Sequence, residues 1–194
     1  MPAIPKYEGT RCYQHLCTQY CVIYNDNKQE LDRREFLAES GKDPRQQFIE
    51  HLLSDTAGTG SIIVYNEDFE KKRLEELAEL FPQYKEQIKQ RIDRIKDLMI
   101  PFKKRDYYHP SFKKQYSIKV VLPVLCPEHE SSYKNLSINN GSLAMSKYEM
   151  LERMGPKEKL ETKIALKDYC YMDVLAMVKI VEALERMVAK TKVT

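Results

Sequence analysis

Two short stretches of the sequence place acidic and polar side chains where they could take part in chemistry. The first is YNEDFE, residues 65–70, in which Asn66 ends an apolar run and Glu70 lies in the first turn of an expected helix. Polar residues often cap a helix, and acidic residues complement the positive end of its dipole. The turn therefore has a purely structural interpretation, and a catalytic interpretation requires a second acidic group brought close to it.

The second stretch is YCYMD, residues 169–173, in which Tyr169 and Asp173 are four residues apart. On a helix this spacing puts both side chains on one face. A neighbouring apolar stripe continues through Met177, Ile180 and Leu184. An aspartate at the edge of such a stripe is either paired or binds something, because a buried charge is costly. A tyrosine one turn away can align a water molecule beside a metal ion that the aspartate holds.

A possible zinc site near the start of the chain is less convincing. Cys12, Cys17 and Cys21 lie near His15, but their spacing is unusual for zinc and no C-x2-C pair follows. In a strand, Cys12 would also point away from the other two thiols. We expect small buried thiols there. An odd total of five cysteines without an export signal suggests free thiols in a reducing compartment.

Basic and aromatic residues alternate in the region 101–118. Such a stretch can form a platform for single-stranded nucleic acid, because cations neutralise phosphates and aromatic rings stack on bases. The alternative is a solvated loop whose aromatic rings pack into the core, and the sequence leaves both open. The residues concerned are Lys103, Lys104, Arg105, Tyr107, Tyr108, His109, Phe112, Lys113, Lys114 and Tyr116.

The order of expected elements predicts an α/β domain with a mixed sheet. The expected strands are residues 12–26 with a turn at their end, 29–39 as the hairpin partner, and 61–65 as a fully buried strand. The expected helices are residues 44–55, 69–81 and the region around Ile88, Ile92 and Ile95. Two more follow, a short helix at 117–125 broken at Pro123 and a long one at 156–190. Residues 94–102 either close the preceding helix or form another short strand. The turn at 65–70 then lies at the carboxyl end of the sheet, where open α/β sheets place their ligands.

Length and composition fit one domain spanning residues 1–194. The chain is 42% hydrophobic and 31% charged with a net charge of +3, which suits a soluble globular protein and permits a nucleic-acid partner without arguing for one. No apolar run approaches the length of a membrane span, and no signal peptide is evident. We expect a cytoplasmic protein with no membrane partner.

Taken together, these stretches resemble the DnaQ-like, or DEDD, 3′→5′ exonucleases of the ribonuclease-H-like fold. YNEDFE is similar to their second motif, YCYMD to the tyrosine form of their third, and YSIKVVLPVL at residues 116–125 to the segment between them. A closer resemblance, covering nearly the whole chain, is to a bacterial domain of unknown function within this superfamily, often found at the C-terminal end of longer proteins with a nuclease-like N-terminal region. The fold it implies is a ribonuclease-H-like mixed sheet flanked by helices.

The resemblance also implies roles for individual residues. These enzymes cut phosphodiesters with two Mg²⁺ or Mn²⁺ ions held by four carboxylates. Glu70 and Asp173 correspond to two of the metal ligands, although the superfamily usually has Asp at the position of Glu70. Tyr169 would orient the attacking water. Asp97 would support the site from behind, and the candidates for substrate contact are Asn66, Tyr116 and Lys119.

One departure from the family pattern is severe. The first motif, a central strand ending in D-x-E, supplies the other two carboxylates, and in the closer subfamily it lies just before the stretch that corresponds to PAIP at residues 2–5. We therefore expect an N-terminally truncated domain with a gap in its sheet, weak or absent nuclease activity, and an open inner edge that invites a partner strand, for example from a second copy or an upstream nuclease-like domain. The alternatives are a non-catalytic module that binds single-stranded nucleic acid and a purely structural part of a larger protein.

Overall fold

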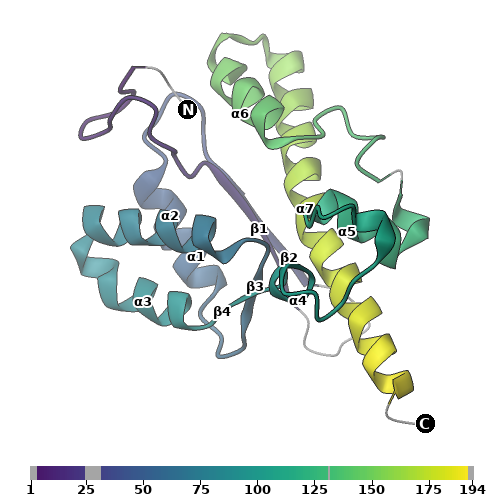
Figure 1. Ribbon diagram of the computed structural model, residues 1–194. Coiled ribbons are helices and arrows are strands. Elements are labelled where there is room, and N and C mark those ends of the chain that lie inside the picture. Colours follow the sequence, from purple (N-terminus) through teal and green to yellow (C-terminus); the bar gives the residue numbers. More distant parts are fainter. Residues whose placement is uncertain (1–3, 25–31, 131, 192–194) are drawn as a thin grey trace.

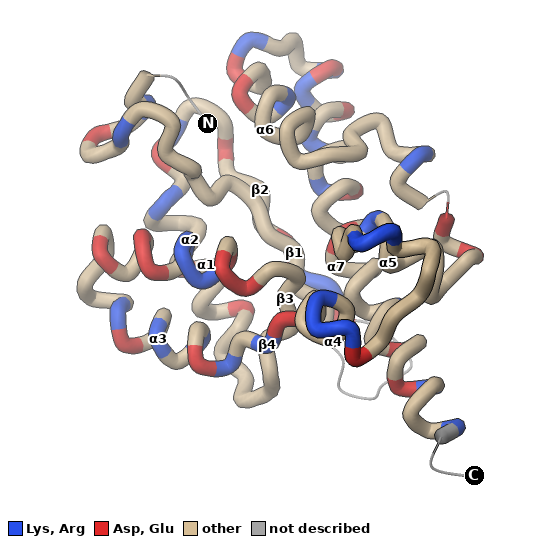
Figure 2. Tube along the Cα trace, viewed as in Figure 1, with Lys and Arg blue, Asp and Glu red and all other residues tan. Residues whose placement is uncertain are grey.

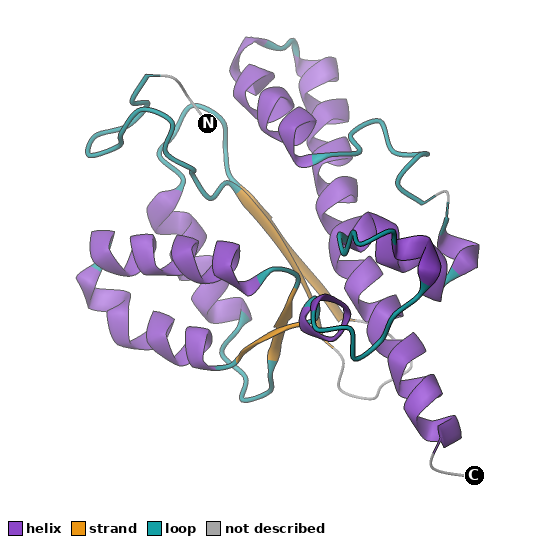
Figure 3. Ribbon diagram, in the orientation of Figure 1, coloured by secondary structure: helices purple, strands orange, loops and turns teal. Residues whose placement is uncertain are grey.

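The computed structural model describes residues 4–24, 32–130 and 132–191. It is a mixed α/β structure in which helices surround two small sheets (Figure 1). The predicted α/β class is confirmed. The strands are few and short, and helices make up most of the chain (Figure 3).

The first sheet is an antiparallel hairpin. Strand β1 (Gln19–Tyr24) pairs with β2 (Asp32–Leu37), with Gln19 opposite Leu37 and Tyr24 opposite Asp32. The hairpin partnership predicted from the sequence is confirmed, and the turn expected at residues 25 and 26 lies outside the described residues. Tyr20 stacks on its neighbour Phe36 with ring centroids 5.8 Å apart, a cross-strand aromatic pair of the kind that stabilises hairpins.

The second sheet consists of two short parallel strands, β3 (Ile62–Val64) and β4 (Ile95–Asp97). The connection between them contains α2 (Glu67–Leu80) and α3 (Lys85–Asp93), as parallel strands require a crossover. Of the two alternatives for residues 94–102, the short strand is correct, so Ile95 belongs to a strand and not to the preceding helix. The prediction of full burial for β3 is wrong, because Ile63 is 41% exposed at an edge that faces a cavity.

The remaining helices form the outer layers. They are α1 (Arg45–Asp55), α4 (Ile100–Lys103), α5 (Ile118–Leu125), α6 (Gly141–Met150) and α7 (Pro156–Thr191), with short 3-10 turns at Pro82–Tyr84, Pro110–Phe112, Pro127–His129 and Leu151–Arg153. Helix α5 continues two residues beyond Pro123, so the predicted break there is wrong. No helix in the described parts of the chain is long and apolar enough to cross a membrane.

Helix α7 organises the core. It packs against α5 in the largest apolar cluster, whose fully buried members include Phe102, Phe112 and Ile180. Nearer its start it packs against α6 in a second cluster around Leu166. A third cluster, around Ile49 and Ile88, joins α1, α2 and α3 on the other side of the strands (Figure 1). The strands thus lie between α7 and the α1–α3 layer.

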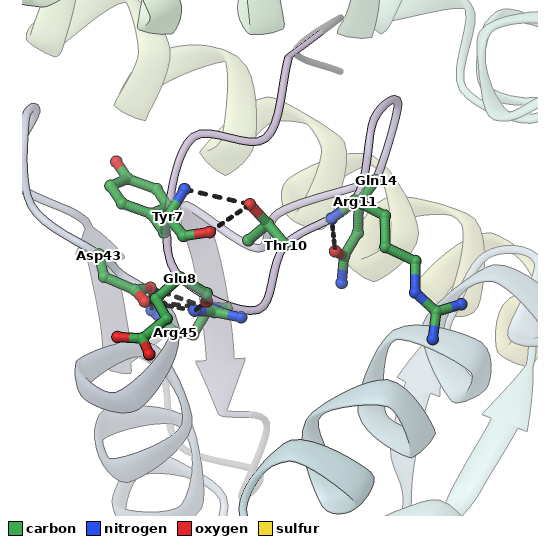
Figure 4. A network of polar contacts seen from close by, with 7 residues as sticks. All are labelled: Tyr7, Glu8, Thr10, Arg11, Gln14, Asp43 and Arg45. Carbon is green, nitrogen blue, oxygen red and sulfur yellow. Dashed lines mark hydrogen bonds and ion pairs between the residues drawn. The ribbon is translucent and has the colours of Figure 1, made fainter.

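The N-terminal loop is held to the start of α1 by a buried arginine (Figure 4). Arg45 is 7% exposed, its Nη2 lies 2.6 Å from the carboxylate of Asp43, and the same nitrogen donates a 2.7 Å hydrogen bond to the carbonyl of Glu8. The hydroxyl of Thr10 accepts from the backbone N–H of Tyr7 and donates to its carbonyl. These contacts fix the loop beside the cavity described below.

Replacing Arg45 with Met is expected to release this loop. The change leaves the Asp43 carboxylate and the Glu8 carbonyl without their shared donor. Because the Asp43 side chain is 40% exposed and water can replace the guanidinium, the expected loss of stability is about 1 kcal/mol. Limited proteolysis should then cut between residues 4 and 16 faster than in the unchanged protein. Arg34→Met, at an exposed cation, serves as the control, and equal cleavage of both variants would contradict the anchoring role.

Candidate functional site

A cavity of about 1250 Å³ lies between the two sheets. The lining comes from β1 and β3, from α1 and α2 on one side and from α7 on the other. Glu70, Lys119, Tyr169 and Asp173 all contribute to it. The structure therefore brings together acidic, basic and tyrosine side chains that are about a hundred residues apart in the sequence.

The turn between β3 and α2 has an unusual backbone. Asn66 has φ 80° and ψ 73°, in the left-handed region, and its side chain makes no capping hydrogen bond. Its N–H donates instead to the carboxylate of Asp97, 2.9 Å away, which also accepts from the N–H of Met99 at 2.8 Å. Asp97 thus ties the carboxyl ends of β3 and β4 together. Whether Asp97 also supports a metal site stays a prediction. Of the two possible capping residues, Asn66 and Asp68, Asn66 makes no side-chain cap.

Glu70 follows this turn on the first turn of α2. The side chain is accessible to solvent, yet protein atoms enclose it at the edge of the cavity. This desolvation raises the pKa of Glu70 above its usual value, and the nearby Arg73 guanidinium partly opposes the rise. A carboxyl group with a raised pKa in a cavity is a common feature of functional sites.

Asp173 lies across the cavity on α7. Desolvation raises the pKa of Asp173, while hydrogen bonds from Tyr133 and Tyr169 and the charge of Lys119 pull it down. The hydroxyl of Tyr133 donates to Asp173 at 2.7 Å. Tyr169 and Asp173 both line the cavity, as two side chains one turn apart on one helix face can. Tyr133 is an additional partner that no sequence pattern indicated, because it lies in an irregular segment far from α7 in the sequence.

Lys119 supplies positive charge on the same side of the cavity. Its Nζ lies 4.9 Å from the ring centroid of Tyr133 and 5.5 Å from that of Tyr169. It also donates to the carbonyl of Asn139. These contacts hold the ammonium group beside the two tyrosines that bind Asp173, where it can attract an anion.

The pKa of the Cys170 thiol depends on burial and on the charges of Glu70 and Asp173. Burial raises the pKa of Cys170, and the charges of Asp173 and Glu70 raise it further. Burial also raises the pKa of the Cys17 thiol, just before β1, and the charge of Glu70 adds to the rise. Both thiols therefore stay protonated at neutral pH.

Three of the expected site residues do not line the cavity. Asn66 lies in the turn and Asp97 at the end of β4, and neither lines the cavity. The ring of Tyr116 packs against Phe112, at 6.4 Å between centroids, and the carbonyl of Tyr116 accepts a hydrogen bond from Tyr65. Tyr116 thus supports the core, while Lys119, one turn further along, reaches the cavity.

The described residues do not form a complete metal site. Within the described residues no group of three or more His, Cys, Asp or Glu side chains is arranged to hold an ion, and this includes Cys12, Cys17 and Cys21. Mg²⁺ can be held by one or two carboxylates with waters and substrate phosphates filling its other positions. Glu70 and Asp173 supply two carboxylates to this cavity, and a two-ion site requires further oxygen ligands.

The region 101–118 packs mainly into the core. Phe112 is fully buried, and its ring lies 5.9 Å from that of Phe102 and 6.1 Å from that of Tyr107. Tyr108 is 52% exposed. Lysines and an arginine gather at the end of α4 and just beyond it (Figure 2). Of the features expected of a nucleic-acid platform, the structure therefore has a basic surface and one exposed aromatic ring, that of Tyr108.

Replacing Tyr133 with Phe is expected to raise the pKa of Asp173 further. The change removes a hydrogen bond that stabilises the charged carboxylate and leaves the desolvation in place. Since a metal ion binds the deprotonated form, the pH midpoint of Mn²⁺ binding, followed by calorimetry, should move upward. Tyr84→Phe, which removes a hydrogen bond to Glu50 on another surface, should leave the midpoint unchanged. A downward shift for Tyr133→Phe would contradict the assigned contact.

Comparison with known proteins places this arrangement in a family. Residues 1–117 match the model of a domain of unknown function, DUF2779. The chain belongs to the DUF2779 family. The matched part of this DUF2779 chain contains the N-terminal loop, both sheets and the turn that carries Glu70, and ends before Lys119 and α7. No solved structure matches it.

The DUF2779 chain also matches longer curated proteins. The uncharacterized protein MG366 of Mycoplasma genitalium is 29% identical over 163 residues, covering 75% of this chain and 23% of that protein. Its homolog in Mycoplasma pneumoniae is 26% identical over 194 residues, covering 87% and 28%. The uncharacterized protein UU173 of Ureaplasma parvum is 30% identical over 149 residues, covering 68% and 21%. The chain spans about a quarter of the length of these relatives.

Proposed function

We propose that this chain is an exonuclease-like domain of a longer nuclease-associated protein, with a ribonuclease-H-like fold and a cytoplasmic location. Its substrate would be a single-stranded end of DNA or RNA, cut by metal-dependent phosphodiester hydrolysis. Residues 1–194 by themselves are expected to have little or no activity, because they provide only part of the metal-binding set.

One observation supports this proposal most directly. Glu70, Tyr169 and Asp173, which resemble the second and third exonuclease motifs, line a single cavity together with Lys119. A helix cap would account for Glu70 alone, but it would not account for an aspartate on another helix facing the same space. The raised pKa values of both carboxyl groups are in line with a site that is stabilised by binding a cation.

Each residue has a defined part in the proposed site. Glu70 and Asp173 would hold Mg²⁺ or Mn²⁺, which when bound activates water and stabilises the leaving oxygen. Tyr169 would orient a water molecule beside Asp173, and Lys119 would attract a phosphate group of the substrate. Asn66 and Asp97 would keep the turn before Glu70 in position.

The test is a calorimetric titration of the chain with Mn²⁺, with and without a short single-stranded oligonucleotide, together with a nuclease assay. Saturable binding that the oligonucleotide strengthens supports the proposal. Glu67→Gln is the control for Glu70→Gln, because Glu67 lies on the same helix and pairs with Lys71. If Glu70→Gln and Glu67→Gln bind Mn²⁺ equally, the assignment of Glu70 is wrong.

A second candidate is a non-catalytic module that binds single-stranded nucleic acid. The exposed ring of Tyr108, which follows Lys103, Lys104 and Arg105 closely in the sequence, favours it. In that case an oligonucleotide would bind without Mn²⁺ and without being cut, and its affinity would fall steeply with salt. Tyr108→Ala would weaken this binding and leave any Mn²⁺ binding unchanged.

A further inference from the structure

The edge of β1 away from β2 presents backbone hydrogen-bonding groups to the cavity. The carbonyl of Thr18 accepts from the N–H of Ala38 at 2.8 Å. This hydrogen bond determines which residues of β1 direct their backbone N–H and C=O groups toward β2. Hydrogen-bonding directions alternate along a strand, so Tyr20 and Val22 face β2. Gln19, Cys21 and Ile23 then direct their N–H and C=O groups into the cavity, and all three line it.

The edge of β3 away from β4 also presents backbone hydrogen-bonding groups to the cavity, from the side opposite β1. Ile62 donates to the carbonyl of Arg94 at 2.9 Å, and the carbonyl of Val64 accepts from Leu98 at 2.9 Å. Ile62 and Val64 therefore face β4, and Ile63 and Tyr65 direct their backbone groups into the cavity. Within the described residues each sheet has only two strands, so no third strand pairs with either edge.

The two edges run in opposite directions. The start of β1 lies near the end of β3, because the ring of His15, shortly before β1, packs against that of Phe69 in the first turn of α2, with centroids 5.7 Å apart. The end of β1 lies near the start of β3: Tyr24 donates to the carbonyl of Asp55, and Arg94 links Thr56 to Gly60, at 2.8 and 2.7 Å. One extended segment between them would be parallel to one strand and antiparallel to the other, an ordinary arrangement in a mixed sheet.

Both walls of the cavity are apolar along this path. Val174, Met177 and Val178 of α7 line one side, and Phe48, Leu74 and Leu77 of α1 and α2 line the other. The volume exceeds the roughly 300–1,000 Å³ of ordinary small-molecule pockets. In the same cavity the buried amide oxygen of Gln19 accepts no hydrogen bond from any described residue. A polypeptide strand, apolar on both faces, fits these walls and edges, as buried central strands do.

We propose that this cavity is an acceptor groove that binds one extended polypeptide segment between β1 and β3, joining the two sheets into one. The occupant is a run of about five or six apolar residues, the usual length of a strand. Its N–H and C=O groups pair with Gln19, Cys21 and Ile23 on one side and with Ile63 and Tyr65 on the other.

The segment comes from the same polypeptide, outside residues 1–194. This chain spans only about a quarter of its curated relatives, so similar proteins have a long additional stretch of chain. Lys6 and Tyr7 also line the cavity, as does Tyr148 of α6. A segment that led into Lys6 would leave the groove where Lys6 lines it.

The test is hydrogen exchange of individual amides, in the presence of a chelator so that no metal contributes. The probe is a synthetic peptide of about five alternating valines and isoleucines with lysines at both ends. It should slow exchange by at least about tenfold at Gln19, Cys21, Ile23 and Ile63, with smaller changes at Tyr20 and Val22. The same peptide methylated on alternate backbone nitrogens keeps its side chains but loses half of its donors, and should have no such effect.

A pair of variants on α7 tests the groove wall. Val178→Lys places a charge in the groove and should weaken peptide binding by at least about tenfold. Val188→Lys, on the exposed part of the same helix, should not. Equal protection by the methylated peptide, or none at the four amides, would overturn the proposal. If these amides exchange slowly without peptide and the protein is a dimer, a second copy of the chain occupies the groove and the proposed occupant is wrong. None of these results depends on nuclease activity.

Discussion

Replacing Asp173 with Asn is expected to abolish saturable Mn²⁺ binding and at the same time to raise the Tm at pH 7. Desolvation raises the pKa of Asp173, so the folded protein holds this proton more tightly than the unfolded chain does. The stability that this group contributes is therefore present below its unfolded pKa of about 3.9 and is lost as the pH rises through the folded value. At pH 7 a neutral amide removes that cost.

Asn can still accept the hydrogen bond from Tyr133, because the two side chains have nearly the same shape. Each kcal/mol of stabilisation should raise the Tm by roughly 2–4 °C in a protein of this size. Asp168→Asn, at an exposed position on the same helix, is the control and should change neither quantity. A lower Tm for Asp173→Asn would show that the carboxylate is a structural partner, and retained Mn²⁺ binding would remove it from the site.

Replacing Phe112 with Ala is expected to destabilise the protein by about 3–5 kcal/mol. Phe112 is fully buried and its ring contacts those of Phe102, Tyr107 and Tyr116. A small folded protein has a free energy of unfolding of only about 5–15 kcal/mol, so this one change removes a large share of it. Urea unfolding followed by circular dichroism measures the loss.

Tyr108→Ala provides the matched comparison in the same loop. The ring of Tyr108 is exposed, so its removal should change the free energy of unfolding by less than about 0.5 kcal/mol. If Phe112→Ala were as stable as Tyr108→Ala, the aromatic residues of this region would form a surface platform instead of part of the core.

The sequence predicts the regular parts of this fold well. The β1–β2 hairpin, α1 and the long helix α7 were expected because alternating or helically spaced apolar residues lie between clear turn and start signals. The exposure of Ile63 was not, because an apolar run indicates a strand but not which strands lie beside it. Pro123 predicts a break in the helix, yet α5 continues for two more residues.

In the candidate site, too, the positions fixed by a regular helix could be predicted, and the contacts from irregular segments could not. Tyr169 and Asp173 could be placed on one face because a helix fixes their spacing. Their hydrogen-bond partner Tyr133 could not, since an irregular segment gives no periodic signal. The backbone contact from Asn66 to Asp97 was also hidden, because it depends on how β3 and β4 align. Whether Glu70 and Asp173 bind metal remains a prediction.

The division of the strands into two separate sheets has a consequence for the order of folding. Each sheet joins strands that are near each other in the sequence, residues 19–37 in one and 62–97 in the other. Structures built from such local contacts form quickly, because little chain entropy is lost before the contacts are made. The hairpin and the β3–β4 unit should thus appear as early, independent kinetic phases. Docking of α7 on β1, which joins segments far apart in the sequence, should set the slowest step.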